Sequence, residues 1–355
     1  MVKILGAGLS GLSAGINLLK KGLLVTFYEK RKDVGEQILP NYQGLLNIEG
    51  DIKKYLNSLN LNPDFDMQVF SKAYICTRKR DIPVKLAESI PFVLRGGKNS
   101  LEYGLYKEAL QLGAKFEFNS NKKDKDVDIV ATGHTRCDMV AFGAVYENLN
   151  FERDCFLYMH DDRLSPIGWY LYLIPYTDGK FEIVNCVSQP YCNQAKKLFF
   201  KGIKERKILR EIVGQNKPLH YFGGFGGVDI PNSAIKANKI YYVGEAAGFQ
   251  DICRGFGMKY ALESGHLAAR SLLFHKESYD NMWKEKFKRQ FKKDFSIRFA
   301  MTLLKDKLPE WYFRNVKDND IVDFNKITPK GVIIELLEEI CYELEFVRKK
   351  FTGHW

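Results

Sequence analysis

Long apolar stretches are missing from this sequence. No run approaches the roughly 18 uninterrupted apolar residues that a membrane-spanning helix requires, although hydrophobic residues make up 45% of the chain. An apolar strand pattern already begins at residue 2, so we expect no secretory signal peptide before it. These absences predict a protein of the cytoplasm.

Cysteine pairs of the kind that bind zinc or form disulfide frameworks are missing too. The seven cysteines are odd in number and dispersed, and no two of them are separated by only two residues. His134 and His160 are isolated, without the spacing of a Ser-His-Asp triad or a metal site. We therefore expect no metal and a reducing compartment.

Acidic residues are outnumbered by basic ones. The chain has 54 lysines and arginines against 43 aspartates and glutamates, which gives a net charge of +11. No nucleic-acid recognition motif or basic low-complexity tail accompanies this charge, so we expect no nucleic-acid partner. An anionic membrane surface or a phosphate-bearing substrate would suit the charge, and so would a lysine-rich proteome. The charge alone leaves the partner open.

The first 29 residues carry the pattern of a dinucleotide-binding unit. A short apolar strand is expected at 2–5, a helix at 9–21 and a second strand at 23–28, which ends in the acidic Glu29. Three glycines in the spacing G-x-G-x-x-G lie between the first strand and the helix. The strand before the glycines and the acid about 20 residues after them make this motif more specific than glycines alone.

Each residue of this motif has a physical role. Gly6 permits the tight turn, Gly8 lets the backbone approach a pyrophosphate, and Gly11 lets the helix pack closely on the strand. The phosphates would lie on free N–H groups at the helix N-terminus, where the helix dipole also favours anions. Glu29 is expected to accept hydrogen bonds from ribose hydroxyls.

The rest of the chain alternates strand and helix patterns and then turns helical. Residues 30–47 look like a loop, 100–112 like a helix and 127–131 like a buried strand. One basic amphipathic helix is expected near 193–213, within a mainly β-rich middle. Residues 278–355 are expected to be almost entirely helical.

This order predicts an α/β fold with discontinuous domains, and 355 residues suffice for one large or two ordinary cores. A Rossmann-like, parallel-sheet domain is interrupted by an antiparallel β-sheet domain that would bind substrate, and a helical C-terminal region comes last. The expected boundaries are 1–60, 95–140 and 235–275 for the nucleotide-binding domain, 61–94 and 141–234 for the inserted domain, and 276–355 for the C-terminal region.

Three motifs in this order resemble one family. The first is the set from Gly6 to Glu29, and the second is Asp128–Gly133, similar to a short strand whose end lies near a bound dinucleotide. The third, Val243–Gly257, looks like the G-D-A-A-G segment that holds the ribityl chain and pyrophosphate of FAD. Together they resemble flavoproteins of the glutathione-reductase fold, in the branch that contains aromatic hydroxylases, halogenases and geranylgeranyl reductases.

The resemblance implies FAD as the cofactor. Its binding residues would be Gly6, Ala7, Gly8, Leu9, Ser10, Gly11, Glu29, Lys30, Arg31, Arg95, Ala131, Thr132, Gly133, Gly244, Glu245, Gly255, Phe256 and Gly257. Arg95 would contact phosphate or ribityl oxygens; the alternative is a solvated surface arginine. Glu245 stands where the family usually has aspartate, and Ile252 where it often has proline. Neither departure removes a chemical group that the cofactor needs.

Residues 168–175 are the best discriminator within this branch. They read Tyr-x-Tyr-x-Ile-Pro at the positions where geranylgeranyl reductases have Tyr-x-Trp-x-Phe-Pro and halogenases a related Trp-x-Trp-x-Ile-Pro. Because alternate residues of a strand share a face, Tyr170, Tyr172 and Ile174 would form one wall, with Pro175 beside them, against a long apolar substrate. The alternative is an ordinary sheet face within a core.

A cysteine that the family's reductases often carry is missing from residues 37–44. Cys253 lies instead in the loop expected beside the flavin, directly before Arg254. A thiol activated by Arg254 or by a helix N-terminus makes Cys253 the one candidate catalytic residue. The alternative interpretation is a small packing residue.

An aromatic stripe marks the first C-terminal helix. Trp283, Phe287, Phe291, Phe295 and Phe299 recur at every fourth position, and residues 281–305 hold eight lysines or arginines against two acids. This pattern predicts either an aromatic ridge packed on the nucleotide-binding domain or a basic, aromatic surface that rests on anionic lipid.

The resemblance and the motifs lead to one expected function. The chain would be an FAD-dependent oxidoreductase that saturates geranylgeranyl-type double bonds of a lipid or prenyl substrate, by hydride transfer from N5 of the reduced flavin. NADPH or ferredoxin would supply electrons, and the protein would lie in the cytoplasm with peripheral contact at the inner membrane face. The alternatives are a flavin-dependent monooxygenase or halogenase, and a non-catalytic prenyl-binding protein similar to the guanine-nucleotide dissociation inhibitors.

Overall fold

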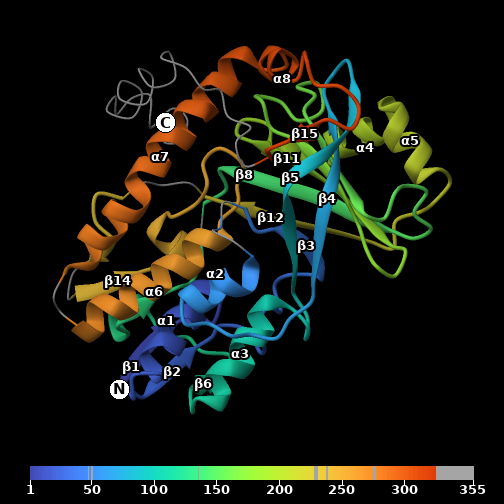
Figure 1. Ribbon diagram of the computed structural model, residues 1–355. Coiled ribbons are helices and arrows are strands. Elements are labelled where there is room, and N and C mark those ends of the chain that lie inside the picture. Colours follow the sequence, from blue (N-terminus) through green and yellow to red (C-terminus); the bar gives the residue numbers. More distant parts are fainter. Residues whose placement is uncertain are drawn as a thin grey trace. The chain divides into compact units, whose positions relative to one another are not determined.

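The computed structural model describes residues 1–46, 48, 51–134, 136–227, 231–236, 239–274 and 277–324. The chain forms two compact units, each assembled from three segments (Figure 1). Unit 1 comprises Met1–Met67, Phe92–Thr135 and Gly227–Phe291. Unit 2 comprises Gln68–Pro91, Arg136–Gly226 and Lys292–Trp355. The region expected to be almost entirely helical over 278–355 contains a strand, β15 (Ile321–Val322), which corrects that prediction. Its residues from 325 onward lie outside the described residues.

Unit 1 is built on a largely parallel sheet. In the described residues its strand order is β13-β14-β7-β1-β2-β6, and only β13 runs antiparallel to its neighbour. The strands are β1 (Val2–Leu5), β2 (Val25–Tyr28), β6 (Lys115–Glu117), β7 (Ile129–Val130), β13 (Ile235–Lys236) and β14 (Ile240–Tyr242). Parallel strands buried on both faces need continuous apolar runs, which explains the fully buried VTFY of β2.

The helices of unit 1 agree with the sequence pattern. They are α1 (Leu9–Leu19), α2 (Ile52–Ser58), α3 (Leu101–Gln111) and α6 (Met258–Phe274). Ser100 caps α3, since its Oγ accepts a hydrogen bond of 3.2 Å from the Tyr103 N–H. The expected loop over 30–47 is wrong at one place: β3 (Asn41–Gly44) pairs antiparallel with the last residues of β5 (Asp81–Arg95).

Close backbone contacts hold α1 against its neighbours. Gly6 has φ +100°, and a Cβ there would lie 2.4 Å from the carbonyl oxygen of Ala131. A Cβ on Gly11 would lie 2.2 Å from the Gly6 oxygen, and one on Gly265 would lie 2.2 Å from the Ser10 oxygen. Only glycine permits these three approaches, which bring α1, α6 and the end of β7 together.

Unit 2 contains a mixed sheet with the order β12-β8-β11-β10-β9-β4-β5-β15 in the described residues. Its strands are β4 (Met67–Cys76), β5 up to Pro91, β8 (Met139–Tyr146), β9 (Cys155–Met159), β10 (Leu171–Pro175), β11 (Phe181–Ser188), β12 (His220–Gly226) and β15 (Ile321–Val322). Most neighbours are antiparallel as expected, but β4–β9 and β5–β15 are parallel pairs.

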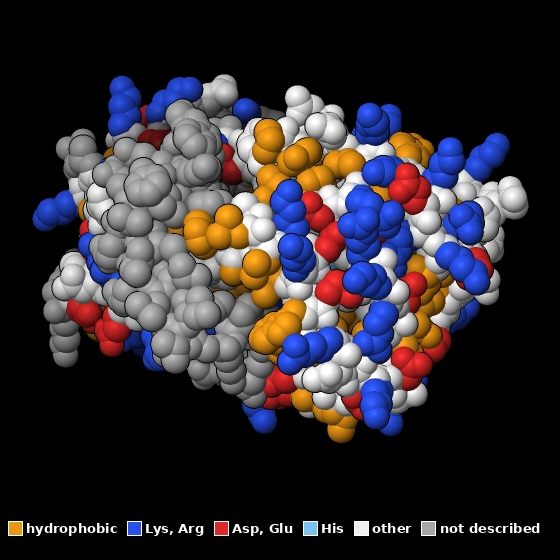
Figure 2. Space-filling view, turned by 90° about the horizontal axis from the view of Figure 1, so that it is seen from above, with side chains coloured by type: hydrophobic (Ala, Val, Ile, Leu, Met, Phe, Trp, Pro, Cys, Tyr) orange, Lys and Arg blue, Asp and Glu red, His pale blue; other side chains and the backbone are white. Residues whose placement is uncertain are grey.

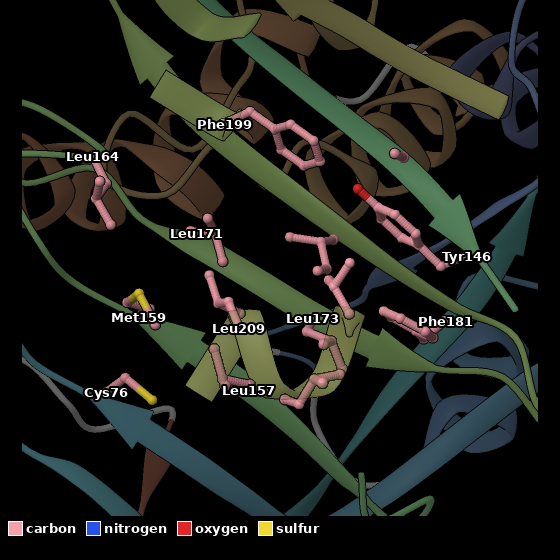
Figure 3. Packing of buried hydrophobic residues seen from close by; sticks show 14 residues of the cluster. Cys76, Tyr146, Leu157, Met159, Leu164, Leu171, Leu173, Phe181, Phe199 and Leu209 are labelled. Carbon is pink, nitrogen blue, oxygen red and sulfur yellow. The ribbon is translucent and has the colours of Figure 1, made fainter. Parts of the chain in front are cut away.

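One face of this sheet is covered by α4 (Ala195–Glu205) and α5 (Lys207–Val213). Leu171, Leu173 and Phe181 of the sheet and Phe199 and Leu209 of the helices lie in one buried cluster (Figure 3). The cluster is continuous across the two kinds of element, which is what makes unit 2 a domain core in its own right.

The prediction of a single helix over 193–213 is wrong, because the helix is interrupted at Arg206. The backbone of Arg206 is extended, with φ −85° and ψ 118°. Its buried guanidinium donates to the carbonyl oxygen of Thr77 at 2.8 Å and pairs with Asp161 at 3.3 Å and with Asp81. A buried guanidinium needs such partners, so these contacts outweigh the local preference for one continuous helix.

The aromatic stripe lies on α7 (Tyr279–Leu304), which α8 (Lys307–Tyr312) follows. Within unit 1, Trp283 and Phe287 are at most 2% exposed, and both rings contact Phe249 with centroids 5.1 and 5.4 Å apart. Phe291 contacts Tyr260 at 5.0 Å. The stripe is therefore a packed ridge, and its interpretation as a lipid-binding surface is wrong because these rings are buried.

The composition of the helices and of one molecular face concerns possible contact with a membrane. Among the described residues, no helix combines the length and the apolar composition needed to cross a bilayer. On the face shown in Figure 2, lysine and arginine side chains are interspersed with acidic and apolar ones. A mixed face of this kind is typical of a solvated surface.

Gly11→Ala is expected to lower the free energy of unfolding by about 2–3 kcal/mol, because the new methyl group would lie 2.2 Å from a backbone oxygen. Gly8→Ala is the matched control. Its Cβ position has no atom within 4 Å, so the expected loss stays below about 1 kcal/mol. Urea unfolding of both variants measures the difference, and equal losses would contradict the packing argument.

Candidate functional site

Three segments that are far apart in the sequence meet around the first turn of α1. Ala131, at the end of β7, lies against Gly6. Gly244, which follows β14, lies so close to α1 that a Cβ there would be 2.8 Å from the Ser10 Oγ. The Gly244 N–H donates to Ser264 Oγ on α6 at 2.8 Å, which fixes this approach. The three sequence motifs therefore form one site within unit 1.

The N-terminus of α1 has no side-chain cap, whereas those of α2 and α3 are capped. Asp51 caps α2 and Ser100 caps α3 through side-chain hydrogen bonds, whereas Gly8 at the N-cap of α1 has no side chain to offer. Apart from its chain neighbours and the backbone of α1 itself, no atom of the described residues lies within 4 Å of the position that a Gly8 Cβ would take. The first N–H groups of a helix have no partner within the helix, and the helix dipole is positive at this end. The open space beside Gly8 therefore suits a phosphate group.

Glu29 is held at the edge of this turn. Its Oε2 accepts a hydrogen bond of 2.8 Å from the Ala7 N–H, and its Oε1 accepts one of 3.0 Å from the Arg31 N–H. A carboxylate has about four lone-pair positions, so both oxygens can still accept from ribose hydroxyls. The side chains of Lys30 and Arg31 are exposed beyond it.

Arg95, at the end of β5, belongs to a buried polar cluster. Its side chain is only 13% exposed, which overturns the interpretation as a solvated surface arginine. Nη1 donates to Gln43 Oε1 at 3.0 Å, and Nε pairs with Glu102 of α3. The other Glu102 oxygen is buried without a hydrogen-bond partner among the described residues. The sequence pattern did not reveal Gln43 and Glu102, because only the fold places them beside Arg95.

Glu245 lies in the turn η4 (Gly244–Ala247) and titrates unusually. Burial of its carboxyl group raises its pKa from 4.5 to about 7, while a hydrogen bond from Gln250 and the charge of Arg95 oppose the rise. The Gln250 Nε2 donates to Glu245 Oε1 at 2.8 Å. The electrostatic influence of Arg95 on Glu245 shows that these two predicted cofactor residues lie near each other. Gln250 is a further member that the sequence analysis missed.

The segment after Gln250 is a tight, buried turn. Asp251 Oδ1 accepts hydrogen bonds from the N–H groups of Cys253 at 2.7 Å and Arg254 at 3.0 Å. A Cβ on Gly257 would lie 2.4 Å from Gln250 Oε1, so the turn closes tightly on itself. Cys253 is buried in it, and its catalytic role stays a prediction.

The remaining predicted cofactor residues differ in their surroundings. Gly133 has φ +75° and open space around its Cβ position, and Thr132 beside it is exposed. Gly255 has φ +80°, a conformation that favours glycine. The Phe256 ring lies 3.6 Å from the Cβ position of Gly44 on β3. These residues extend the site from the end of β7 to β3.

The predicted substrate wall lies in unit 2. Leu171 and Leu173 point into the cluster of Figure 3, so Tyr172 and Ile174 occupy the opposite face of β10. The Tyr170 ring precedes the strand and stands 6.1 Å from the Tyr172 ring. Pro175 pairs with Phe181 of the core cluster and therefore shares the core face rather than the tyrosine face.

Further side chains join this tyrosine face. The ring of Tyr158, on β9, lies 4.8 Å from that of Tyr170. Glu182, on β11, stands opposite Ile174 in register, is fully buried, and accepts a hydrogen bond of 2.5 Å from the Tyr176 hydroxyl. Burial and the charge of Glu182 raise the pKa of Tyr172 well above its usual value. The face thus combines aromatic rings with a buried carboxyl group, which the apolar run around Glu182 did not predict.

No protein-family model matches the sequence, and a search of curated proteins finds no match. Solved structures do match. A geranylgeranyl bacteriochlorophyll reductase-like protein from Thermoplasma acidophilum is similar with a TM-score of 0.71 at 18% identity, over 100% of this chain and 98% of that one. A flavoprotein/dehydrogenase from Cytophaga hutchinsonii has a TM-score of 0.63 at 15% identity, over 99% and 96%.

The flavin-dependent brominase Bmp2 also matches, with a TM-score of 0.63 at 15% identity over 99% of this chain and 98% of that one. The resemblance predicted from the three motifs is confirmed: the chain has the fold that flavoprotein reductases and halogenases share. At these identities the similarity shows the fold, and the chemistry has to be argued from the residues.

Glu245 makes the stability of the fold depend on pH. Because its folded-state pKa of about 7 lies above 4.5, the folded protein keeps a proton between these values that the unfolded chain releases. Stability from this group is therefore complete below about pH 4.5 and declines as the pH rises through 7, by about 3 kcal/mol.

Glu245→Gln is expected to remove this decline. Urea unfolding of the variant and the unmodified protein at about pH 5 and about pH 8 measures the difference between their slopes. The comparison has to be made between the two proteins, because burial lowers the pKa of His266 to about 4 and its titration acts in the opposite direction. Identical slopes would contradict the assigned pKa.

Proposed function

We propose that unit 1 binds FAD and that the chain is an FAD-dependent oxidoreductase. The observation that carries this proposal is the convergence of the three motifs around the open N-terminus of α1. The pyrophosphate would lie over Gly8 on the first N–H groups of the helix, and Glu29 would hold the ribose of the adenosine. Arg95 and Glu245 would bind the phosphate and ribityl part.

FAD supplies hydride chemistry when bound, and the side chains of this protein provide orientation and exclusion of water. Arg95 gives a positive charge that is already held in place by Gln43 and Glu102, so little ordering is needed when an anion binds. Glu245, with a pKa of about 7, can carry or release a proton near neutral pH and can therefore accept or donate a hydrogen bond at a ribityl hydroxyl.

We propose an isoprenoid of the geranylgeranyl type as the substrate, attached to a lipid or prenyl group. The buried rings of Tyr158 and Tyr170 and the partly exposed ring of Tyr172 offer an apolar wall with hydroxyl groups, which suits a chain of isolated double bonds. The similarity to a geranylgeranyl reductase-like protein supports this substrate class. NADPH or a ferredoxin would reduce the flavin, and the lipid would be met at the inner membrane face.

A second candidate is a flavin-dependent monooxygenase or halogenase. The similarity to the brominase supports it, because that structure matches this chain over nearly the whole length of both proteins. The two candidates differ in what consumes the reduced flavin: an alkene in the reductase, and oxygen in the others. A non-catalytic prenyl-binding protein is the third candidate, and a purified protein that binds no flavin would favour it.

Gly8→Val is expected to weaken FAD binding by at least about tenfold, because the added methyl groups enter the space proposed for the pyrophosphate. Gly224→Val is the matched control, since Gly224 on β12 also has no atom within 4 Å of its Cβ position. Titration of flavin-free protein with FAD measures affinity, and thermal unfolding checks that both variants are folded. Unchanged FAD affinity in a folded Gly8→Val variant would contradict the proposed site.

Flavin reoxidation without oxygen is expected when the reduced protein meets a geranylgeranyl phospholipid. The yellow absorbance should return together with saturation of the lipid, which mass spectrometry measures. The matched control is the same phospholipid with a fully saturated chain, which should leave the flavin reduced. If the flavin stays reduced in both mixtures until oxygen is admitted, the reductase proposal is contradicted. The monooxygenase or halogenase then becomes the supported candidate.

A further inference from the structure

Two cysteines that are distant in the sequence meet at one end of the β8–β11 strand pair in unit 2. β8 begins at Met139, which pairs with Ser188, the last residue of β11. Cys137 therefore comes just before one strand and Cys192 just after the other. The Cys192 Sγ lies 3.9 Å from the carbonyl oxygen of Asp138, the residue that follows Cys137.

Backbone and amide hydrogen bonds hold the two segments together. The Gln189 N–H donates to the Asp138 carbonyl oxygen at 3.0 Å, and the Gln189 Nε2 donates to the Cys137 carbonyl oxygen at 3.0 Å. The Cys137 Sγ lies 4.0 Å from the Met139 carbonyl oxygen. The Cys137 thiol also influences the titration of Cys192, in agreement with sulfur atoms that lie near each other. The pair is thus built by the strand register and not by sequence proximity.

The two thiols differ in their access to solvent. Cys137 is exposed, whereas Cys192 is half-buried. Burial, together with the neighbouring Cys137 thiol and the Asp138 carboxylate, raises the pKa of Cys192 to about 12. The other cysteines of the described residues, Cys76, Cys155, Cys186 and Cys253, are buried. Attack on a dissolved disulfide therefore begins at Cys137, and Cys192 follows as the resolving thiol.

We propose that Cys137 and Cys192 form a reversible disulfide by exchange with a low-molecular-weight disulfide such as glutathione disulfide. The Cys137 thiolate attacks one sulfur of glutathione disulfide, so that a mixed disulfide forms and one glutathione thiolate leaves. Cys192 then loses its proton to solvent and attacks the Cys137 sulfur, which releases the second glutathione. The protein dithiol is oxidised by two electrons, and one glutathione disulfide is reduced to two glutathiones.

The proposed disulfide would connect two elements of unit 2 and would be accessible from solvent. It would join Cys137, two residues before β8, to the short turn η2 (Cys192–Gln194), which leads directly into α4. The Cys137 side is exposed, so an external thiol can reach and reverse the bond. The site is independent of the proposed flavin site, because all of its residues belong to unit 2.

Alkylation mapping of the full-length, flavin-loaded protein tests the proposal. After incubation with glutathione disulfide, the remaining thiols are blocked with N-ethylmaleimide and peptides are identified by mass spectrometry. Cys137 and Cys192 are expected to lose alkylation together and to appear in one linked peptide, and dithiothreitol should restore both thiols.

Cys192→Ser is expected to retain glutathione on Cys137, whereas Cys137→Ser should leave Cys192 alkylated and form no linked peptide. Cys186→Ser is the matched control, because Cys186 lies on the same strand pair but is buried, and it should keep the link. Thermal unfolding of the reduced variants shows that they are folded.

The proposal is overturned if both thiols of the unmodified protein stay fully alkylated after glutathione disulfide. A linked peptide between Cys137 and any other cysteine, such as Cys341, overturns it as well. So does a Cys192→Ser variant that is folded but takes up no glutathione, since the exposed Cys137 is then not the attacking thiol.

Discussion

The close approach of α1 to its neighbours is the constraint on which the candidate site depends. Gly11 lies on Gly6, and Gly265 lies on the backbone of Ser10, at separations that no side chain would allow. This contact sets where the open N-terminus of α1 stands relative to the ends of β7 and β14. Since close-packed interiors do not adjust to added atoms, a single methyl group at these positions would displace the elements that form the site.

Electrostatics add a second layer to the same site. Arg95 is paired with Glu102 in a buried cluster, and its positive charge also lowers the pKa of Glu245. Removing one partner from such a cluster leaves a buried charge without compensation, which is costly. An anionic ligand would add a further partner to the same cation. Binding of such an anion would therefore stabilise unit 1.

The two faces of β10 and β11 in unit 2 carry different kinds of side chain. The face with Leu171 and Leu173 packs on α4 and α5 and supplies the core (Figure 3). The other face carries Tyr172 and the buried Glu182. In β10 and β11 nearly every residue on both faces is buried, so the alternation that would distinguish the two faces is hard to see in the sequence.

The elements of the candidate site that depend on local backbone geometry could be predicted from the sequence. The G-x-G-x-x-G turn, its flanking strand and helix, and the acid at Glu29 follow from backbone conformations and spacings that neighbouring residues decide. The fold expected from these motifs is confirmed by the solved structures that match. The helix capped by Ser100 was predictable for the same local reason.

Features that depend on burial and on contacts between distant residues could not be predicted from the sequence. Arg206 interrupts the expected helix because Asp81 and Asp161 lie within its reach. The aromatic ridge of α7 is buried, and Cys137 meets Cys192, because packing and strand register bring these residues to their partners. The raised pKa of Glu245 likewise results mainly from burial of its carboxyl group. Which carboxyl groups become buried cannot be predicted from the sequence, because burial depends on tertiary packing.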